Sequence, residues 1–311
     1  MAAEQATSVS VRVPGKINLQ LGVGRLEADG YHQVATVLHA VSLFDEVTAT
    51  PAESERVALT VRGSAAEGVP TGESNLAVRA ARLLAMRAGV RGGVELLLHK
   101  EIPVAAGMGG GSADAAAALV ACDALWGTSL PRAELMSLAA ELGSDVPFAL
   151  VGGTVVGSGR GEQLTPALAR GQYHWVLALS EHGLSTPAVY AEFDRLTSGR
   201  VRTEPRISDR LMQALRSGDG AALGVALQND LQAAACSLRP GLCDLVDIGR
   251  EYGALGGLVS GSGPTVAFLV RDNEHALDLS VALTASGACE QVKRVHGPVH
   301  GARVSEPVRL K

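Results

Sequence analysis

Four glycines within five positions, Gly107, Gly109, Gly110 and Gly111, are followed directly by Ser112 and then by an alanine-rich run. A backbone without Cβ atoms can approach a ligand closely, and the free N–H groups at the start of a helix attract anions. The pattern therefore predicts an anion site, most often for phosphate, although a tight strand-to-helix turn that binds nothing could use the same residues. The dinucleotide fingerprint is excluded because Ser112 occupies its sixth position, and the Walker pattern because the chain contains no Gly-Lys-Ser or Gly-Lys-Thr.

An ammonium and an amide lie two positions apart in another segment. The alternation after Pro14-Gly15 predicts a strand with Ile17 and Leu19 towards the core and Lys16, Asn18 and Gln20 on the other face. This places Lys16 and Asn18 side by side on a rigid strand. A solvated strand face is the alternative, because antiparallel sheets commonly leave one face in water.

Two further segments place polar groups next to a turn or a helix start. In Gly143-Ser144-Asp145-Val146-Pro147-Phe148, Asp145 can cap a short helix, and a capping and a catalytic aspartate are equally compatible with these residues. Residues 27–32 indicate a turn in which Gly30 suits a positive φ, with Tyr31 and His32 immediately after it.

The elements that must position these residues follow from hydrophobic spacing and from turn residues. The pattern is that of a mixed, mostly antiparallel α+β beginning, with a loose domain boundary between Gly159 and Gly171. The expected strands cover residues 8–13, 16–23, 34–43, 57–61, 94–98, 151–156, 175–179 and 265–270. The expected helices cover residues 75–88, 131–142, 209–216, 221–235, 241–251 and 273–285, with one more from the glycine loop to Trp126 and one entered at Pro187.

Length and charge limit the classes of protein. A chain of 311 residues can bury a sizeable core, and two domains are expected. A formal net charge of −5 and an aromatic content of 3% argue against a nucleic-acid partner. Residues 254–270 are apolar but interrupted by glycines and Pro264, and residues 1–10 lack a basic and an apolar region. We therefore expect no membrane partner and a cytoplasmic location.

The cysteines show no Cys-x-x-Cys pairing, and we expect reduced core residues rather than a disulfide framework or a metal site; they are Cys122, Cys236, Cys243 and Cys289.

Three separated stretches resemble the three sequence motifs of the GHMP small-molecule kinases. They are residues 14–19 (Pro-Gly-Lys-Ile-Asn-Leu), the loop at residues 103–112, and residues 260–264 (Ser-Gly-Ser-Gly-Pro), in the order and at roughly the spacing of the family. The resemblance covers nearly the whole chain. It implies a two-domain α+β fold, with an N-terminal mixed βαβ domain that carries a phosphate-binding glycine loop (residues 1–165) and a C-terminal ferredoxin-like α/β domain (residues 166–311).

Within the family, three stretches are most similar to members that act on a cytidine-diphosphate-linked methylerythritol in the non-mevalonate route to isoprenoid precursors: residues 16–19 (Lys-Ile-Asn-Leu), 28–32 (Ala-Asp-Gly-Tyr-His) and 143–148. This similarity implies transfer of the γ-phosphoryl group of ATP to the 2-hydroxyl group, with Mg²⁺. Lys16 and Asp145 would be catalytic: opposite Lys16, the Asp145 carboxylate can accept or orient the hydroxyl proton, while the ammonium stabilises charge at the attacking oxygen. Asn18 would hold the same hydroxyl region.

The resemblance also implies which residues bind ATP. Gly107, Gly109, Gly110 and Gly111 would donate N–H groups to its phosphates, with Ser112 near the phosphates or Mg²⁺. Asn75 and Lys100 are candidates for the adenine side, with a helix N-terminus and a solvated strand end as the alternatives. The acidic Mg²⁺ ligand of mevalonate-type members has no clear match, so no protein ligand to the metal is assigned.

For the cytidine end, the resemblance assigns the base edge to His32 and stacking to Tyr31 and Tyr190, with Thr186 and Pro187 beside them. Half-exposed surface tyrosines are the alternative. Two other functions stay open: a homoserine or mevalonate type of kinase, and a ligand sensor that keeps the fold without catalysis. The oligomeric state is not predicted.

Overall fold

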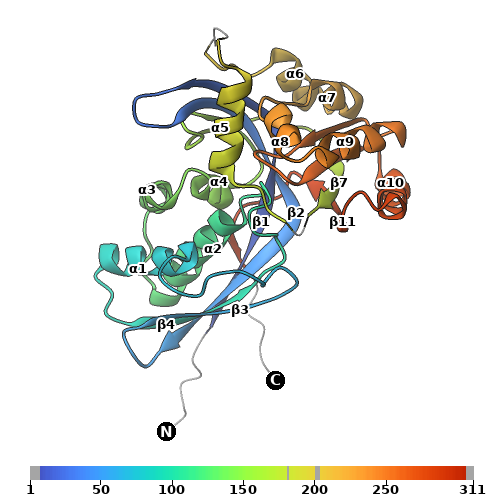
Figure 1. Cartoon of the computed structure of the whole chain (residues 1–311). Helices are drawn as coiled ribbons and strands as arrows, with labels where there is room; N and C mark the ends of the chain where they lie inside the picture. The colour runs from blue at the N-terminus through green and yellow to red at the C-terminus, as the bar shows by residue number, and fades with distance from the viewer. Residues whose placement is uncertain (1–7, 181, 200–203, 306–311) are drawn as a thin grey trace.

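The computed structural model describes residues 8–180, 182–199 and 204–305. Two long strands, β1 (Val9–Leu26) and β2 (His32–Ala52), run through the middle of the molecule (Figure 1). Helices α1 to α4 cover one side of them, and most of the C-terminal part lies on the other side, coloured yellow to red in Figure 1. The strand that carries Lys16 and Asn18 is thus central to the molecule.

The larger sheet has eight strands in the order β12-β1-β2-β4-β3, with β5 added at β2, β6 paired to β5, and β8 added at β1. β1 pairs antiparallel with β2, and the register shifts between Pro14 and Gly15. The two strands expected on either side of this dipeptide are therefore one strand with an irregularity where proline lacks an N–H group. The remaining strands are β3 (Val57–Arg62), β4 (Gly93–His99), β5 (Thr154–Ser158), β6 (Gln163–Pro166), β8 (Gln228–Asn229) and β12 (Arg303–Val304).

The helices of this part begin and end where the sequence indicates. Asn75 caps the first helix with its side chain, and Gly89 and Gly127 end the first and second helices in the left-handed conformation. The expected strand at residues 151–156 is correct only from Thr154, because the preceding helix extends to Val151. The helices are α1 (Leu76–Ala88), α2 (Gly110–Trp126), α3 (Arg132–Leu142) and α4 (Val146–Val151).

The second sheet is antiparallel with the order β11-β7-β10-β9, that is, β7 (Tyr173–Leu179), β9 (Gly256–Val259), β10 (Val266–Val270) and β11 (Gln291–Gly297). Helices follow β7 and β10, so the connectivity is that of a ferredoxin-like fold, and this expectation is confirmed. The helices are α5 (Thr186–Leu196), α6 (Asp209–Ser217), α7 (Gly220–Ala226), α8 (Gln232–Leu238), α9 (Gly241–Glu251) and α10 (Asn273–Ser286).

The continuous helix expected over residues 221–235 is wrong. The short strand β8 separates α7 from α8 and pairs in parallel with β1 at Gln20 and Leu21. The N–H group of Asp230 also donates to the Leu21 carbonyl at 2.9 Å. Local helical spacing gave no sign of this contact, because the partner strand lies two hundred residues earlier in the chain.

The change from one sheet to the other falls between Pro166 and Tyr173, close to the expected boundary. However, β8 and β12 return to the first sheet and pair with β1. The division at residue 165 stays a prediction, since strands from both parts share one sheet.

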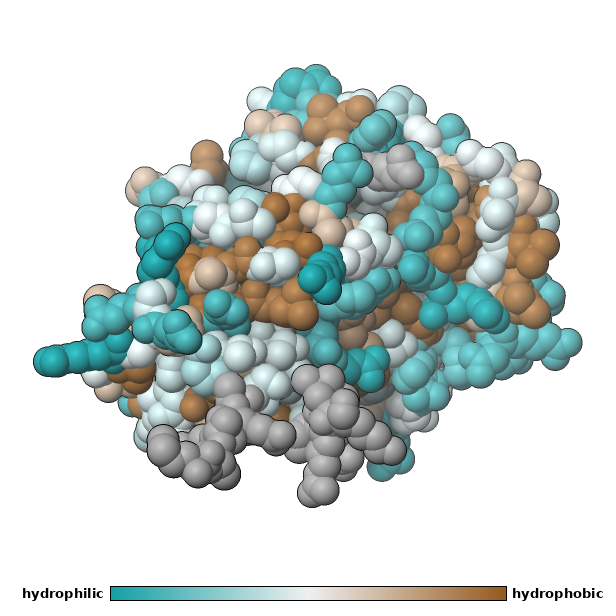
Figure 2. Space-filling view, turned by 90° about the horizontal axis from the view of Figure 1, so that it is seen from below, coloured by the Kyte–Doolittle hydropathy of each residue, from teal (hydrophilic) through white to brown (hydrophobic). Residues whose placement is uncertain are grey.

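The surface seen from below mixes hydrophilic and apolar residues, with apolar ones gathered near the middle of this face (Figure 2). Within the described ranges, none of the helices is both long and apolar enough to cross a membrane.

One expectation about the cysteines is wrong. Cys236 in α8 and Cys243 in α9 form a disulfide, because the turn at Arg239-Pro240 brings their Cα atoms to 5.6 Å. Cys122 and Cys289 are free, and Cys122 is buried as expected.

Candidate active site

The glycine loop packs tightly against other parts of the chain before it enters α2. Gly107 and Gly109 have φ values of 73° and 69°, a conformation that favours glycine. A Cβ atom on Gly107 would lie 2.2 Å from the Ser260 carbonyl oxygen, which also rules out a side chain there. Gly110 is the first residue of α2, so the N–H groups of Gly110, Gly111 and Ser112 belong to the first turn, which has no intrahelical acceptors. All five predicted loop residues line one cleft.

Lys16 and Asp145 face each other in this cleft. Nζ of Lys16 donates to Oδ1 of Asn18 at 2.7 Å and lies 3.9 Å from Oδ2 of Asp145. Burial lowers the pKa of the Lys16 ammonium, and the Asp145 carboxylate opposes that shift. The alternative of a solvated face on β1 is therefore ruled out, since Lys16, Asn18 and Gln20 are all buried.

Asp145 precedes α4, but its side chain makes no capping hydrogen bond to that helix. The carboxylate is 35% exposed and lines the cleft with Lys16 and Ser144. Of the two roles left open by the sequence, capping has no support in the hydrogen bonds of this residue.

Lys100 lies beneath the glycine loop rather than at a strand end in solvent. Its Nζ atom pairs with the Asp45 carboxylate and lies 3.0 Å from Oδ2 of Asp114. The three side chains are almost completely buried, and burial raises the pKa of Asp114 to about 8. Asp114 in α2 thus serves as a partner of Lys100. A Cβ atom on Gly110 would lie 2.8 Å from Nζ of Lys100, so this ionic cluster supports the first residue of α2.

Neither of the two residues predicted to contact adenine lines the cleft. Nζ of Lys100 is enclosed by its aspartates. Asn75 uses Oδ1 to accept from the Ala77 N–H group at 2.8 Å and Nδ2 to donate to the Pro70 carbonyl at 2.7 Å. Both adenine assignments stay predictions, and the capping alternative for Asn75 is confirmed.

An aromatic group lies at the other end of the cleft. The rings of His32 and Tyr190 stack with centroids 5.2 Å apart. Nδ1 of His32 donates to the Gly24 carbonyl at 3.0 Å, and Nε2 lies 3.3 Å from Oδ2 of Asp194. Burial, with the nearby Asp145 carboxylate, raises the pKa of Tyr190 to about 12, so its phenol remains neutral. His32 is thus held from both ring nitrogens.

Tyr31 is 57% exposed and lines the same space as Tyr190. Thr186 and Pro187, at the start of α5, line it as well, and Thr186 shares a 2.8 Å hydrogen bond with Ser262. The structure therefore brings the predicted substrate residues to one region, although Tyr190 stacks on His32 and Tyr31 has a different ring neighbour.

That neighbour is Arg160, which the sequence analysis missed. Its guanidinium lies 4.2 Å from the centre of the Tyr31 ring and pairs with the Asp29 carboxylate. Arg160 lies between Gly159 and Gly161, which have φ values of 72° and 104°. The Gly-Arg-Gly sequence at this turn was the signal that could have identified it. Thr36 was also missed, because it belongs to β2 and reaches Asn18 only across the sheet.

The two ends lie in adjoining spaces that share lining residues. The space around Lys16 and the glycine loop has a volume of about 370 Å³, and the space between Tyr31 and Tyr190 about 1050 Å³. Arg160, Thr186 and Tyr190 line both. A ligand with a reacting group at one end and a planar ring at the other would fit this arrangement.

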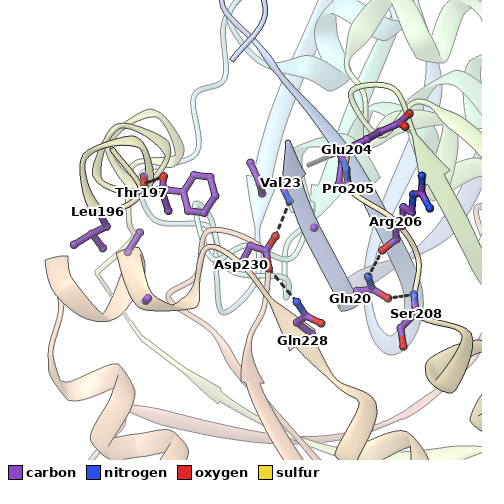
Figure 3. Close-up of a pocket in the computed structure, with 14 residues that line it drawn as sticks. Gln20, Val23, Leu196, Thr197, Glu204, Pro205, Arg206, Ser208, Gln228 and Asp230 are labelled. Atoms are coloured by element: carbon purple, nitrogen blue, oxygen red, sulfur yellow. Dashed lines mark hydrogen bonds between the residues drawn. The ribbon is translucent and has the colours of Figure 1, made fainter. Parts of the chain in front are cut away.

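A separate cavity of about 1050 Å³ lies beside Gln20 (Figure 3). The Gln20 amide donates to the Arg206 carbonyl at 2.8 Å and accepts from the Ser208 N–H group at 2.9 Å. Asp230 accepts from the Val23 N–H group and from the Gln228 amide. These polar groups hold the segments at residues 204–208 and 228–230 to β1, in contrast to the groups that face the cleft.

Magnesium bound together with ATP phosphates needs only one or two protein oxygens. The Ser112 hydroxyl and the Asp145 carboxylate both line the cleft next to the loop and are compatible with that limited role. Among the residues that the structure describes, no cluster of three or more His, Cys, Asp or Glu side chains could hold a metal ion.

Comparison with known families identifies the class of protein. Residues 75–153 match the family described as GHMP kinases N terminal domain, and residues 211–289 match GHMP kinases C terminal. The chain belongs to the GHMP kinase family.

The relatives make the comparison more specific. A protein of Leifsonia xyli subsp. xyli, named 4-diphosphocytidyl-2-C-methyl-D-erythritol kinase, is 53% identical over 96% of this chain and 98% of its own length. A protein of the same name from Thermobifida fusca is 55% identical over the same shares. A crystal structure titled 4-(cytidine 5'-diphospho)-2C-methyl-D-erythritol kinase is 34% identical, with a TM-score of 0.76 over 92% of this chain and 98% of that one.

Proposed function

We propose that this protein transfers the γ-phosphoryl group of ATP to the 2-hydroxyl group of 4-diphosphocytidyl-2-C-methyl-D-erythritol. One observation carries the proposal: the space at the Lys16–Asp145 pair and the glycine loop adjoins the space at the aromatic group around His32, and the two share lining residues. The names of the relatives support the same substrate. A cytoplasmic location and a step in isoprenoid precursor synthesis belong to this proposal.

The chemistry requires positioning and charge stabilisation more than a strong base. Asp145 orients the 2-hydroxyl group and accepts its proton as the new O–P bond forms and the bond to the β-phosphate oxygen breaks, leaving ADP. Lys16 stabilises negative charge at the attacking oxygen and on the transferred group. The first-turn N–H groups of α2 bind the ATP phosphates. Mg²⁺ would neutralise phosphate charge, with Ser112 and Asp145 as its oxygen neighbours.

At the other end, cytosine would stack between Tyr31 and Tyr190, with its edge at His32. Stacking on an aromatic ring contributes about 1–3 kcal/mol per base. Arg160 and Lys16 are cations that line this cleft, and their charges suit a substrate that carries a diphosphate.

The direct test is ADP formation with ATP, Mg²⁺ and the cytidine substrate, with the product examined by phosphorus NMR. Homoserine and mevalonate are the comparison substrates. Turnover of the cytidine compound alone supports the proposal. Preference for either comparison substrate assigns another GHMP activity, and ATP binding without any product indicates a ligand sensor.

The aromatic end has its own test. We expect Tyr31→Ala to raise KM for the cytidine substrate about tenfold and to leave KM for ATP unchanged. Tyr252→Ala is the control, because Tyr252 is 56% exposed and lies outside the cleft. A rise in KM for ATP would show that the two ends of the cleft are wrongly assigned.

A further inference from the structure

A chain of hydrogen bonds leads from Lys16 into the sheet. Lys16 Nζ donates to Asn18 Oδ1 at 2.7 Å, and Asn18 Nδ2 donates to Thr36 Oγ1 at 2.8 Å. The Thr36 hydroxyl then donates to the Gln20 carbonyl at 2.7 Å. All three side chains are at least nine-tenths buried, so water is a poor substitute for these partners.

The direction of this chain is fixed by the Thr36 hydroxyl. A hydroxyl has one hydrogen, and a carbonyl oxygen can only accept, so the hydrogen of Thr36 is used on Gln20. Thr36 therefore presents only lone pairs to Asn18, and only the NH₂ group of the amide can meet them. The amide oxygen must then face Lys16, whereas the flipped amide would place two donors against each other at Lys16 and two acceptors against each other at Thr36.

The surroundings leave Lys16 and Asn18 little freedom to find another arrangement. A Cβ atom on Gly261 would lie 3.2 Å from Asn18 Oδ1 and 3.3 Å from Lys16 Nζ, so the residue 260–264 loop packs directly against the pair. On the cleft side, Lys16 has only the more distant Asp145 carboxylate at 3.9 Å among its described salt-bridge partners. The orientation of one amide thus decides where the ammonium lies.

We propose that Thr36 is a positioning residue for phosphoryl transfer: its hydroxyl sets the Asn18 amide so that the amide oxygen holds Lys16 towards Asp145 and the glycine loop. This inference rests on the proposed function for its choice of substrate. It also means that Asn18 presents an acceptor oxygen to the cleft, which suits a ligand hydroxyl group.

The first test compares three variants in the same turnover assay. Thr36→Val keeps the shape of the side chain and removes the hydroxyl, and we expect kcat to fall about tenfold with KM for ATP unchanged. Thr36→Ser keeps the hydroxyl and restores most of kcat. Thr265→Val is the matched control, because the Thr265 hydroxyl is buried without a hydrogen-bond partner among the described residues, and it retains the wild-type kcat.

The second test separates orientation from general loss of packing. In an Asn18→Asp background both edges of the side chain are oxygens, so no flip can occur and adding Thr36→Val changes kcat less than twofold. An equal tenfold loss in both backgrounds overturns the proposal, as does failure of Thr36→Ser to restore kcat.

A third readout does not depend on the substrate. In a crystal structure of Thr36→Val, Lys16 Nζ is expected to leave the position that it occupies beside Asn18, and an unchanged Lys16 refutes the inference. Failure of the proposed function is recognised differently, because the wild-type protein then does not turn over the cytidine substrate at all.

Discussion

Lys16 and Lys100 are both buried against the glycine loop, but their charges are compensated in opposite ways. Lys100 lies between two carboxylates whose side chains are at most 4% exposed. Lys16 has an amide oxygen at 2.7 Å, and its carboxylate partner, at 3.9 Å, belongs to the cleft. A cation enclosed by buried aspartates serves the structure, whereas one that is loosely paired at a cleft can interact with a charged ligand.

The largest effect is expected from removing the enclosed cation. Lys100→Met leaves the buried Asp45 carboxylate without its counter-charge, and the free energy of unfolding should fall by about 3–5 kcal/mol in urea titrations. Lys293→Met is the control, since Lys293 is 30% exposed and lies 3.9 Å from Glu101, and should cost about 1 kcal/mol or less. Equal stability of the two variants would remove the distinction between the lysines.

The partner of Lys16 should affect rate rather than stability. Asp145→Asn keeps the size of the side chain and removes the carboxylate proposed to accept the proton, and we expect kcat to fall about 100-fold or more, with ATP binding and the urea midpoint nearly unchanged. Steady-state kinetics and ATP titration measure the two quantities. A variant with near-normal turnover would reduce Asp145 to a residue at the start of α4.

The next effect is a dependence on pH. Burial raises the pKa of Asp114 from 3.8 to about 8, so the folded protein keeps a proton that the unfolded chain has lost between these values. The free energy of unfolding should therefore fall as pH rises from about 4 to 8, by at most about 1.4 kcal/mol per pH unit. Asp114→Asn should remove this part of the slope. The same slope in both proteins, measured by urea unfolding at several pH values, would contradict it.

The smallest effect tests the contact between the enclosed cluster and the loop. A Cβ atom at Gly110 would lie 2.8 Å from Nζ of Lys100, whereas one at Gly111 would meet only Leu76 at 3.7 Å. We expect Gly110→Ala to be about 1 kcal/mol less stable than Gly111→Ala in thermal unfolding. If the order is reversed, the cluster does not support the start of α2.

The sequence was most informative where the signal is local. Asn75, Gly89 and Gly127 mark helix ends through their own conformations, and the structure has those ends in place. By contrast, the residues that decide how the charges of Lys16 and Lys100 are compensated lie far from them in the sequence. Asp45 lies 55 residues before Lys100, and the loop that packs on Lys16 comes from the other end of the chain. Strand alternation gave Lys16 the correct neighbours on its face, but it left open whether solvent or protein covers that face, and the fold places protein there.

Local sequence was likewise insufficient to decide the role of Asp145 or to predict β8. An aspartate before a helix has the residue type of a cap, and only the absence of a capping hydrogen bond in the structure separates the two roles. The apolar spacing of residues 221–235 is helical, and the parallel pairing with β1 overrides it. Motif resemblance could indicate which residues belong to the site, but not that the charge of Lys100 is compensated by buried aspartates while that of Lys16 is only loosely paired.

The pairing of β8 and β12 with β1 has a consequence for how the chain can be divided. A fragment that stops near residue 165 would lose both partners from that side of β1 and expose an unpaired strand edge, a ready template for association with other chains. The strand that carries Lys16 is completed only when the last part of the chain has been made, so we expect neither half to form a stable domain by itself.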